Sequence, residues 1–415
     1  MSRPRVVITG LSGLTPLAND IETTWKRLIA GESGLGPITH FDCSAYDSRI
    51  AGEVKGFDPE AFIPAKQARR MDRFTQFAVA GAQMLLKDAD FAINESNAYD
   101  VGVILGVGLG GLQTIETYHA KLLQSGPSKV SPFLIPMLIS NMGPGQIAMF
   151  TGAKGPNIVT TTACASAIHG IGTAYSEILL GRITAAITGG VEATITPLGV
   201  AGFTALKALS THYNDDPTKA SRPFDKARDG FVIGEGAGLL LLETLESAKA
   251  RGARIYAELV GYGASDDAYH MTAPCEDGSG MIRVMRNALR DANLSPDAIG
   301  HINAHATSTM LGDRAENKAV KEVFGEHAKK IKISATKSMT GHLLGASGGI
   351  ESVFTALALY HETLPGTINL VDPDTECDLD YLAGGSEHVA CEYAMCNSFG
   401  FGGTNASIIL RKWTE

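Results

Sequence analysis

The sequence predicts an α/β protein whose sheets are rich in parallel strands and covered by helices on both faces. Short apolar runs of strand length alternate with longer segments of helical period along the 415 residues, and this alternation is typical of βαβ units. Apolar residues make up 44% of the chain and charged residues only 19%, so a large buried core can form. The 47 glycines are scattered among the apolar runs, which indicates tight strand-to-helix turns rather than flexible linkers.

The pattern places the individual elements in chain order. Short apolar runs predict strands at residues 5–9, 101–105, 157–160, 185–188, 254–260, 299–303 and 331–334. Longer segments of helical period predict helices at residues 22–30, 71–88, 166–181, 280–292, 313–324 and 343–361.

Two of these blocks are similar in shape. A strand at 157–160 leads through a small, polar turn into a long helix, and a strand at 332–334 does the same through residues 335–342. Each block would present a reactive side chain at a helix start. No linker separates the two parts, and the change from one to the other falls near residues 251–254. We therefore expect two similar halves, residues 1–253 and 254–415.

Several functional classes conflict with the composition. No apolar run reaches the roughly 18 to 20 residues that a membrane span needs, and the N-terminus lacks the features of a signal or transit peptide. The six cysteines show no C-x-x-C pair and no zinc-site spacing, which favours reduced thiols in a cytoplasmic protein. A net charge of −9 argues against nucleic-acid binding.

Cys164 is the candidate nucleophile. It stands in Thr-Thr-Ala-Cys-Ala-Ser at 161–166, directly before a predicted helix. The partial positive charge and unpaired N–H groups of a helix start stabilise a thiolate, so we expect a lowered thiol pKa. The same N–H groups could hold a developing oxyanion. The alternative is a small structural cysteine packed under a helix, which is the commoner role of an arbitrary buried cysteine.

Two histidines and a lysine lie in similar small-residue turns. His305 follows a predicted strand, and Lys337 and His342 precede the last long helix. Imidazole suits proton transfer or N–H donation near neutral pH, and a nearby ammonium would hold negative charge in place. The same residues could suggest zinc, but the two histidines lack short ligand spacing and no cysteine pair accompanies them. We expect no metal.

Four motifs together resemble the active-site signatures of the β-ketoacyl-acyl carrier protein synthases. They occur in family order along the chain, at 161–166, 303–309, 336–346 and 397–405, and residues 221–225 and 228–238 also resemble that family. Residues 197–200, 210–216 and 267–272 look most like its chain-elongating, type II branch. One departure is Ala306, where the family usually has glycine, and its methyl group could narrow the substrate path.

The resemblance implies a fold and a reaction. The fold would be the thiolase-like α/β body, five-layered αβαβα, with two pseudo-symmetric halves. Cys164 would take an acyl chain from acyl carrier protein, and the backbone N–H groups of Cys164 and Phe401 would hold the oxyanion. His305 and His342 would stabilise the enolate formed when malonyl carrier protein loses carbon dioxide, and Lys337 would orient the histidine site. Because decarboxylation supplies the carbanion, the resemblance implies no cofactor.

Further roles follow from the same resemblance. Phe399 and Phe401 would form a gate, and Leu109 would limit the depth of the acyl pocket. Hydroxyl groups would bind the pantetheine arm, and two acidic residues would support the polar network. The pantetheine-binding residues would be Thr272, Thr307 and Thr309, and the supporting residues Asp267 and Glu316.

The implied partners are acyl carrier protein and a second copy of the chain. Because the carrier is acidic, its docking site should be basic although the whole chain is negative. Lys66, Arg69 and Arg70 are spaced to share one helical face, and Lys207 matches another family contact. A solvated cationic face is the alternative. The family also implies a homodimer formed by pairing of sheet edges.

Four other functions share some of these sequence features. Gly-Val-Gly-Leu-Gly-Gly at 106–111 fits a dinucleotide-binding pattern, but residues 122–147 contain no acidic ribose partner. A thiolase would need a second cysteine as base, and Cys396 lacks the glycine that usually follows after one residue. A non-enzymatic chain-length subunit would have replaced Cys164. A ketosynthase of a polyketide or specialised-lipid pathway remains the principal alternative, because chain specificity is not visible in the motifs.

Overall fold

Ten strands form one continuous hydrogen-bonded sheet in the order β10-β9-β13-β14-β8-β1-β7-β6-β4-β5. The structure is a computed structural model that describes residues 3–414, so residues 1, 2 and 415, at the ends of the two predicted halves, lie outside the described residues. The strands of the sheet are β1 (Val6–Leu14), β4 (Val101–Gly106), β5 (Asn157–Thr160), β6 (Ala185–Glu192), β7 (Gly236–Thr244), β8 (Ala257–Asp266), β9 (Ile299–Asn303), β10 (Lys332–Ser334), β13 (Tyr393–Phe399) and β14 (Thr404–Lys412).

The sheet consists of two halves with the same topology. We number the strands of each half in chain order. From the outer edge of the sheet inward, each half then has its third strand, followed by its second, fourth, fifth and first. In both halves the three outer strands run parallel to one another, and the next strand inward runs antiparallel to both of its neighbours. The halves join where β1 runs antiparallel to β8, with Val6 opposite Leu259. The pseudo-symmetry expected from the two similar blocks is thus present in the strand order.

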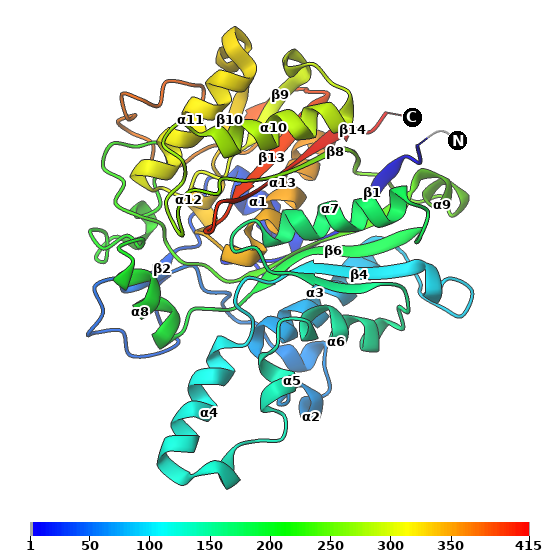
Figure 1. Cartoon of the computed structure of the whole chain (residues 1–415), viewed down its shortest axis with the longest axis vertical. Coiled ribbons are helices and arrows are strands. Elements are labelled where there is room, and N and C mark those ends of the chain that lie inside the picture. Colours follow the sequence, from blue (N-terminus) through cyan, green and yellow to red (C-terminus); the bar gives the residue numbers. More distant parts are fainter. Residues whose placement is uncertain (1–2, 415) are drawn as a thin grey trace.

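Helices fill three layers around the two halves of the sheet (Figure 1). The central layer contains α7 (Ser166–Leu179) and α13 (Ser347–His361). One outer layer contains α3 (Arg73–Asp88) and α6 (Met142–Thr151), and the other contains α10 (Ser279–Ala292) and α11 (Met310–Phe324). The five-layered αβαβα arrangement is therefore confirmed. The remaining helices are α1 (Ile21–Ile29), α2 (Ala65–Ala68), α4 (Leu112–Ser125), α5 (Leu134–Leu138), α8 (Pro197–Ala205), α9 (Leu245–Ala250) and α12 (Lys337–Thr340).

Strand β7 shows how one sheet serves two cores. Leu240 and Leu242 belong to the central core with α7 and α13, whereas Leu239 and Leu241 belong to the outer core with α3. Successive side chains of a strand point to opposite faces, and here both faces are buried. The run of four leucines therefore has no polar alternation, and the strand was missing from the sequence prediction. β13 and β14 were also missed.

The other predicted elements are close to the observed ones. Strands at 157–160 and 299–303 match β5 and β9 residue for residue. The helix predicted from residue 343 begins at Ser347, because residues 344–346 form a 3₁₀ turn and Leu344 has a positive φ of 49°. The boundary predicted at 253/254 lies in the segment between α9 and β8 and stays a prediction.

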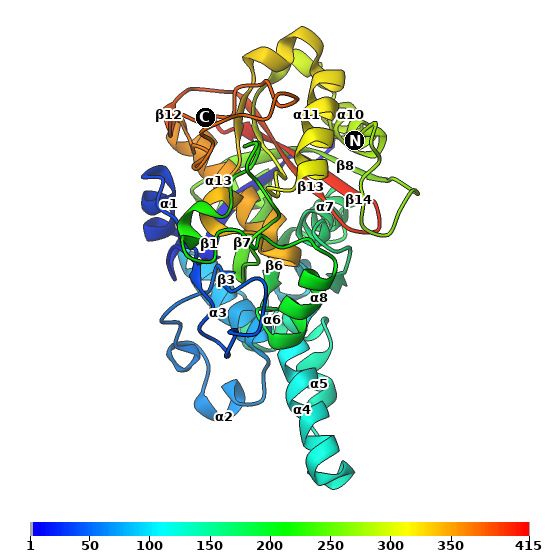
Figure 2. The ribbon, with the colours of Figure 1, turned by 90° about the vertical axis from the view of Figure 1, so that its left-hand side faces the viewer.

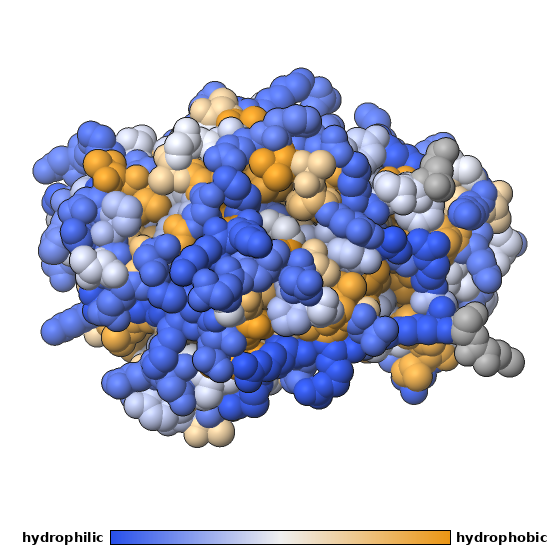
Figure 3. Space-filling view, turned by 90° about the horizontal axis from the view of Figure 1, so that it is seen from above, coloured by the Kyte–Doolittle hydropathy of each residue, from blue (hydrophilic) through white to orange (hydrophobic). Residues whose placement is uncertain are grey.

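Helices α4 and α5 project from the body as an arm (Figures 1 and 2). The arm exposes apolar side chains, including Leu123 at 73% and Ile135 at 59%. At the opposite end, hydrophilic side chains dominate the surface, with hydrophobic ones scattered among them (Figure 3). Within residues 3–414, no helix combines the length and the apolar character that crossing a membrane requires.

Candidate active site

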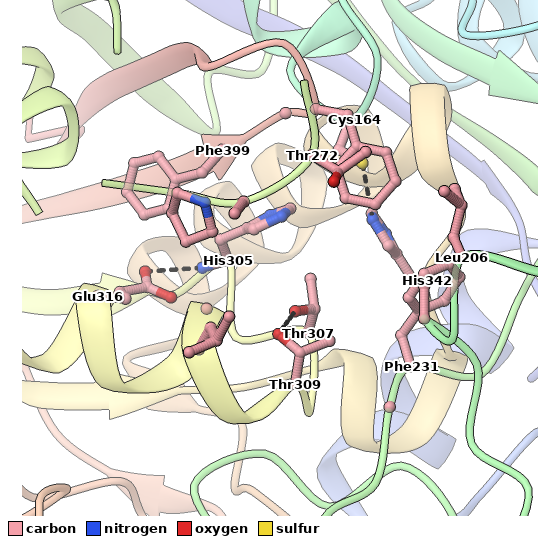
Figure 4. Close-up of a pocket in the computed structure, with 18 of the residues that line it drawn as sticks. Cys164, Leu206, Phe231, Thr272, His305, Thr307, Thr309, Glu316, His342 and Phe399 are labelled. Atoms are coloured by element: carbon pink, nitrogen blue, oxygen red, sulfur yellow. Dashed lines mark hydrogen bonds between the residues drawn. The ribbon is translucent and has the colours of Figure 1, made fainter. Parts of the chain in front are cut away.

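The two central helices start beside the same cavity. Cys164 lies two residues before α7, and His342 lies five residues before α13. Both side chains line a cavity of about 370 Å³, together with His305, which follows β9. Three segments that are far apart in the sequence thus bring their side chains together (Figure 4).

A strained turn presents the sulfur of Cys164. Ala163 has a positive φ of 50°, a conformation that costs about 1 to 3 kcal/mol for a residue other than glycine. Ser166 holds this turn, because its hydroxyl accepts a hydrogen bond from the Thr162 N–H at 2.8 Å and donates to the Ala163 carbonyl at 2.6 Å. The sulfur lies 3.0 Å from Nε2 of His342.

The predicted lowering of the thiol pKa is wrong. Burial raises the pKa of Cys164 to about 12, although the Lys337 charge and a hydrogen bond from the Phe401 N–H act in the opposite direction. Desolvation of the charged form therefore outweighs the favourable partial charges. The resting cysteine is a neutral thiol, and His342 is the adjacent group that can accept its proton.

The two histidines are neutral as well. Burial holds the pKa of both His305 and His342 well below the ordinary value, and the Lys337 charge acts in the same direction. The Lys337 ammonium lies 3.4 Å from Nδ1 of His305. Because an ammonium only donates, Nδ1 must accept and Nε2 carries the proton. His305 is thereby an N–H donor.

Lys337 is itself held by Glu351 on α13. The two side chains form an ion pair and are almost fully buried. An ammonium without a partner at this depth would carry a large desolvation cost, which the Glu351 carboxylate offsets. Glu351 was missed by sequence reasoning. The available signal was an acidic residue within an otherwise small and apolar helix.

Sulfur and imidazole nitrogens of Cys164, His305 and His342 lie within 4.8 Å of one another, as in a three-ligand metal site. The Lys337 ammonium, donating to His305, opposes a divalent cation there. The absence of a resident metal stays a prediction.

Residues 399–405, the predicted gate segment, lie against the turn at 161–166 that carries Cys164. The Thr404 hydroxyl donates to the Thr162 carbonyl at 3.0 Å, and Phe399 and Phe401 line the cavity. Asp267, one of the expected supporting residues, accepts a hydrogen bond from Asn405 at 2.7 Å, and its N–H donates to the Gly403 carbonyl at 2.9 Å. This acidic side chain is therefore tied to the gate segment.

The other predicted residues fall into three groups. Glu316 is buried and accepts hydrogen bonds from the N–H groups of His305 at 2.9 Å and Ala306 at 2.7 Å. All three expected pantetheine-binding threonines line the cavity (Figure 4). Leu109 is 50% exposed and lies outside this cavity, so its role in the acyl pocket stays a prediction.

The basic residues lie in two places. Lys207 lines the cavity. Lys66 lies on α2, which ends at Ala68, so Arg69 and Arg70 follow the short helix rather than continuing one helical face. All three are exposed, and the Arg70 guanidinium lies 4.3 Å from the ring centre of Phe133. Helices α2 and α8, the latter close to Lys207, are apart in both ribbon views.

Glu192 explains the glycine-rich loop at 106–111. Its buried carboxylate accepts N–H bonds from Gly108 at 2.8 Å, Leu109 at 3.2 Å and Gly345 at 3.2 Å. A carboxylate already fills the place where a phosphate would bind, which argues against dinucleotide binding.

The thiolase alternative requires a second cysteine as base in the cavity. Cys396 cannot be that base, because it is fully buried in the central core outside the cavity.

A buried cysteine facing two neutral histidines and a paired lysine, on a body of two similar halves, defines an acyl-condensing enzyme. The chain belongs to the β-ketoacyl synthase family. The model of the family's N-terminal domain matches residues 3–248, and that of its C-terminal domain matches residues 256–371. The family resemblance is thus confirmed.

Curated relatives match over the full length. A 3-oxoacyl-[acyl-carrier-protein] synthase 2 from a Synechocystis species is 52% identical, over 100% of this chain and 99% of that protein. A protein of the same name from Vibrio harveyi is 51% identical over the whole of both chains. Among solved structures, a β-ketoacyl synthase from Burkholderia phymatum has a TM-score of 0.92 at 38% identity, covering 99% of this chain and 100% of that one.

A polyketide ketosynthase is also similar. The structure titled as a type II polyketide acyl carrier protein in complex with its ketosynthase has a TM-score of 0.92 at 32% identity, covering 99% of this chain and 100% of that one. The chain therefore shares its fold with fatty acid and polyketide enzymes and more of its sequence with the former.

Glu192 makes the stability of the protein depend on pH. Burial raises its pKa from 4.5 to about 7. The stabilisation from its proton is complete below pH 4.5 and is lost as the pH rises through about 7. At about 1.4 kcal/mol per pKa unit the contribution is about 3 kcal/mol at most. Urea unfolding at about pH 5 and about pH 7.5 should show a loss of stability in the wild type that is smaller in Glu192→Gln by this contribution.

The comparison of the two proteins removes the contributions of other buried groups. These are the histidines, whose lowered pKa values act with the opposite sign, and Glu316 and Glu351, whose pKa values burial also raises to about 7. Glu22→Gln, at an exposed position, is the matched control and should behave as the wild type. Equal pH dependence in the wild type and Glu192→Gln would contradict the assignment.

Proposed function

We propose that this protein elongates acyl chains on acyl carrier protein by decarboxylative Claisen condensation. An acyl group moves from the carrier to Cys164 and is joined to a two-carbon unit from malonyl carrier protein, giving 3-oxoacyl carrier protein and carbon dioxide. The observation that carries the proposal is the position of the Cys164 sulfur, 3.0 Å from His342 in a cavity shared with His305. Full-length identity of 51–52% to 3-oxoacyl-[acyl-carrier-protein] synthase 2 supports it.

In the first stage the Cys164 sulfur attacks the carbonyl carbon of the carrier thioester. The thiol proton passes to Nε2 of His342 as the carbon–sulfur bond forms. The tetrahedral oxyanion accepts hydrogen bonds from the N–H groups of Cys164 and Phe401. Collapse of this intermediate leaves the acyl group on Cys164. The departing carrier thiolate takes a proton from solvent, so the proton from Cys164 stays on Nε2 of His342.

In the second stage the malonyl group loses carbon dioxide. The electron pair of the broken carbon–carbon bond becomes an enolate, whose oxygen accepts hydrogen bonds from His305 and His342. Lys337, held by Glu351, fixes the N–H of His305 toward the cavity and supplies a nearby positive charge. The enolate carbon then attacks the acyl carbon. The sulfur of Cys164 leaves as a thiolate and takes its proton back from Nε2 of His342.

The surrounding residues complete the proposal. Phe399 and Phe401 gate the passage to Cys164, and Thr272, Thr307 and Thr309 bind the pantetheine arm. Decarboxylation provides the carbanion, so the reaction requires no cofactor. We also propose that residues 1–253 and 254–415 are the two structural units. All six cysteines are free thiols, in keeping with the expected cytoplasmic location.

Fatty acid elongation is favoured over the polyketide alternative. The synthase 2 relatives share 51–52% of their residues with this chain, whereas the ketosynthase of the type II polyketide complex shares 32%. The length of the acyl chain carried by Cys164 stays open.

Mass spectrometry of the intact protein tests the first stage. Incubation with acyl carrier proteins bearing saturated chains of graded length should add one acyl mass per chain, and the extent of labelling should define the length preference. Cys164→Ala should gain no mass. An unmodified wild-type protein with every substrate would overturn the proposal.

We propose that Lys66, Arg69, Arg70 and Lys207 contact the acidic carrier. The double reversal Arg69→Glu and Arg70→Glu should raise the KM for carrier-bound substrate, with the larger effect at low salt, because salt screens the attraction in the wild type. A free pantetheine thioester should react as before. The matched control is Lys329→Glu with Lys330→Glu, at another exposed basic pair. Equal effects of the two reversals would contradict this docking site.

We also propose a homodimer formed along β5. This strand is an outer edge of the sheet, and unpaired edges favour pairing with another strand. Exposed apolar side chains lie nearby, including Met149 on α6 at 64% and Ile158 on β5 at 36%. Sedimentation should show dimers in the wild type and monomers in Ile158→Lys. A monomeric wild type at micromolar concentration would refute the pairing.

A further inference from the structure

The residues at 221–238 have no role in the chemistry described above, yet they include a buried cation. The Arg228 side chain is fully buried. It lies 3.2 Å from a carboxylate oxygen of Asp313 and 2.9 Å from one of Asp374. A guanidinium enclosed by two carboxylates is stable at this depth only while all its partners remain in place.

The same guanidinium holds the main chain that borders the cavity. Its Nε donates to the Thr309 carbonyl at 3.1 Å, and Nη2 donates to the Met310 carbonyl at 3.1 Å. Asp313, one of the two carboxylates beside Arg228, accepts a hydrogen bond from the N–H of Ser308 at 3.1 Å. The buried cluster therefore contacts the turn at 306–309 through backbone atoms, behind the side chains that line the cavity.

This turn has an unusual backbone. Ala306 has a φ of 34° and Ser308 a φ of 68°, both in the left-handed region that favours glycine. The Ser308 hydroxyl accepts the N–H of Arg222 at 3.0 Å, and its carbonyl accepts the N–H of Gly230 at 3.1 Å. Segment 221–230 and the ion cluster thus hold a conformation that the turn would not keep alone.

The held conformation sets two hydroxyl groups beside each other. Oγ1 of Thr307 and Oγ1 of Thr309 are 3.0 Å apart, and both residues line the cavity. One hydroxyl donates to the other, so the pair offers a donor and acceptor to a ligand. An amide of a substrate arm has the complementary groups.

We infer that Arg228, Asp313 and Asp374 are positioning residues that give the site its preference for thioesters carrying an amide-bearing arm. The inference rests on the proposed function and adds a source of its specificity. None of the three residues contacts Cys164, His305 or His342 through a hydrogen bond. Loss of the cluster should therefore weaken recognition of the arm more than the reactivity of the sulfur.

Arg314 provides a matched control within the same cluster. It also pairs with Asp374, at 2.9 Å, but its side chain is 36% exposed. Its other ionic partner is Glu376, and it makes no hydrogen bond to the turn. Arg228→Lys and Arg314→Lys each replace a planar fork by a single ammonium beside the same carboxylate. Only Arg228→Lys removes the guanidinium N–H groups that donate to the carbonyl oxygens of Thr309 and Met310.

The test compares two thioesters of one acyl group, pantetheine and S-ethyl, the second having no amide. In Arg228→Lys the ratio of their kcat/KM values should fall by about tenfold to a hundredfold, mainly through the KM of the pantetheine thioester. Arg314→Lys should keep the wild-type ratio. The rate of Cys164 alkylation by iodoacetamide should change less than twofold in both (about a 0.4 kcal/mol barrier change).

Ser308→Ala covers the case in which Arg228→Lys fails to fold. It removes the hydroxyl that accepts the Arg222 N–H and keeps a Cβ, which disfavours the left-handed φ, so the turn should leave this conformation while the buried charges stay intact. The same ratio should fall. An unchanged ratio in Ser308→Ala, or equal ratios in the two arginine variants, would overturn the inference. Failure of the wild-type protein to accept either thioester would instead count against the proposed function itself.

Discussion

The candidate active site depends on one lysine ammonium that an ion pair holds in the interior. Lys337 is almost fully buried, and its ion pair with Glu351 offsets the cost of removing it from water. The charge then acts on its neighbours. It determines which nitrogen of His305 carries the proton, and it helps to keep both histidines neutral. Because Glu351 belongs to α13, the central helix layer supports the electrostatics of the site as well as the packing of the core.

Pseudo-symmetry explains why the two reactive segments meet. Each half places a long helix in the central layer, and the two helices start beside one cavity. One start carries Cys164, the proposed nucleophile, and the other carries His342, the proposed proton-transfer group. The two similar halves have thus acquired different chemistry at equivalent positions, and neither half alone contains the complete set.

Motif order was enough to predict that Cys164, His305, Lys337 and His342 belong to one site, because these residues stand in short, distinctive turns. Their catalytic roles stay a prediction. The sign of the thiol pKa shift was not predictable. A helix start is visible in the sequence, whereas the burial that outweighs it arises only from packing. Glu192 was missed for a similar reason. The glycine loop looks like a phosphate cradle until the fold brings a carboxylate into it. Strand β7 has no alternation because both its faces are buried.

The junction of β1 with β8 limits how this molecule can move. Since hydrogen bonds run without interruption from one outer edge strand to the other, the halves cannot open and close about a hinge as two lobes do. Any movement that admits substrate would then be confined to segments outside the sheet, within a scaffold that stays still.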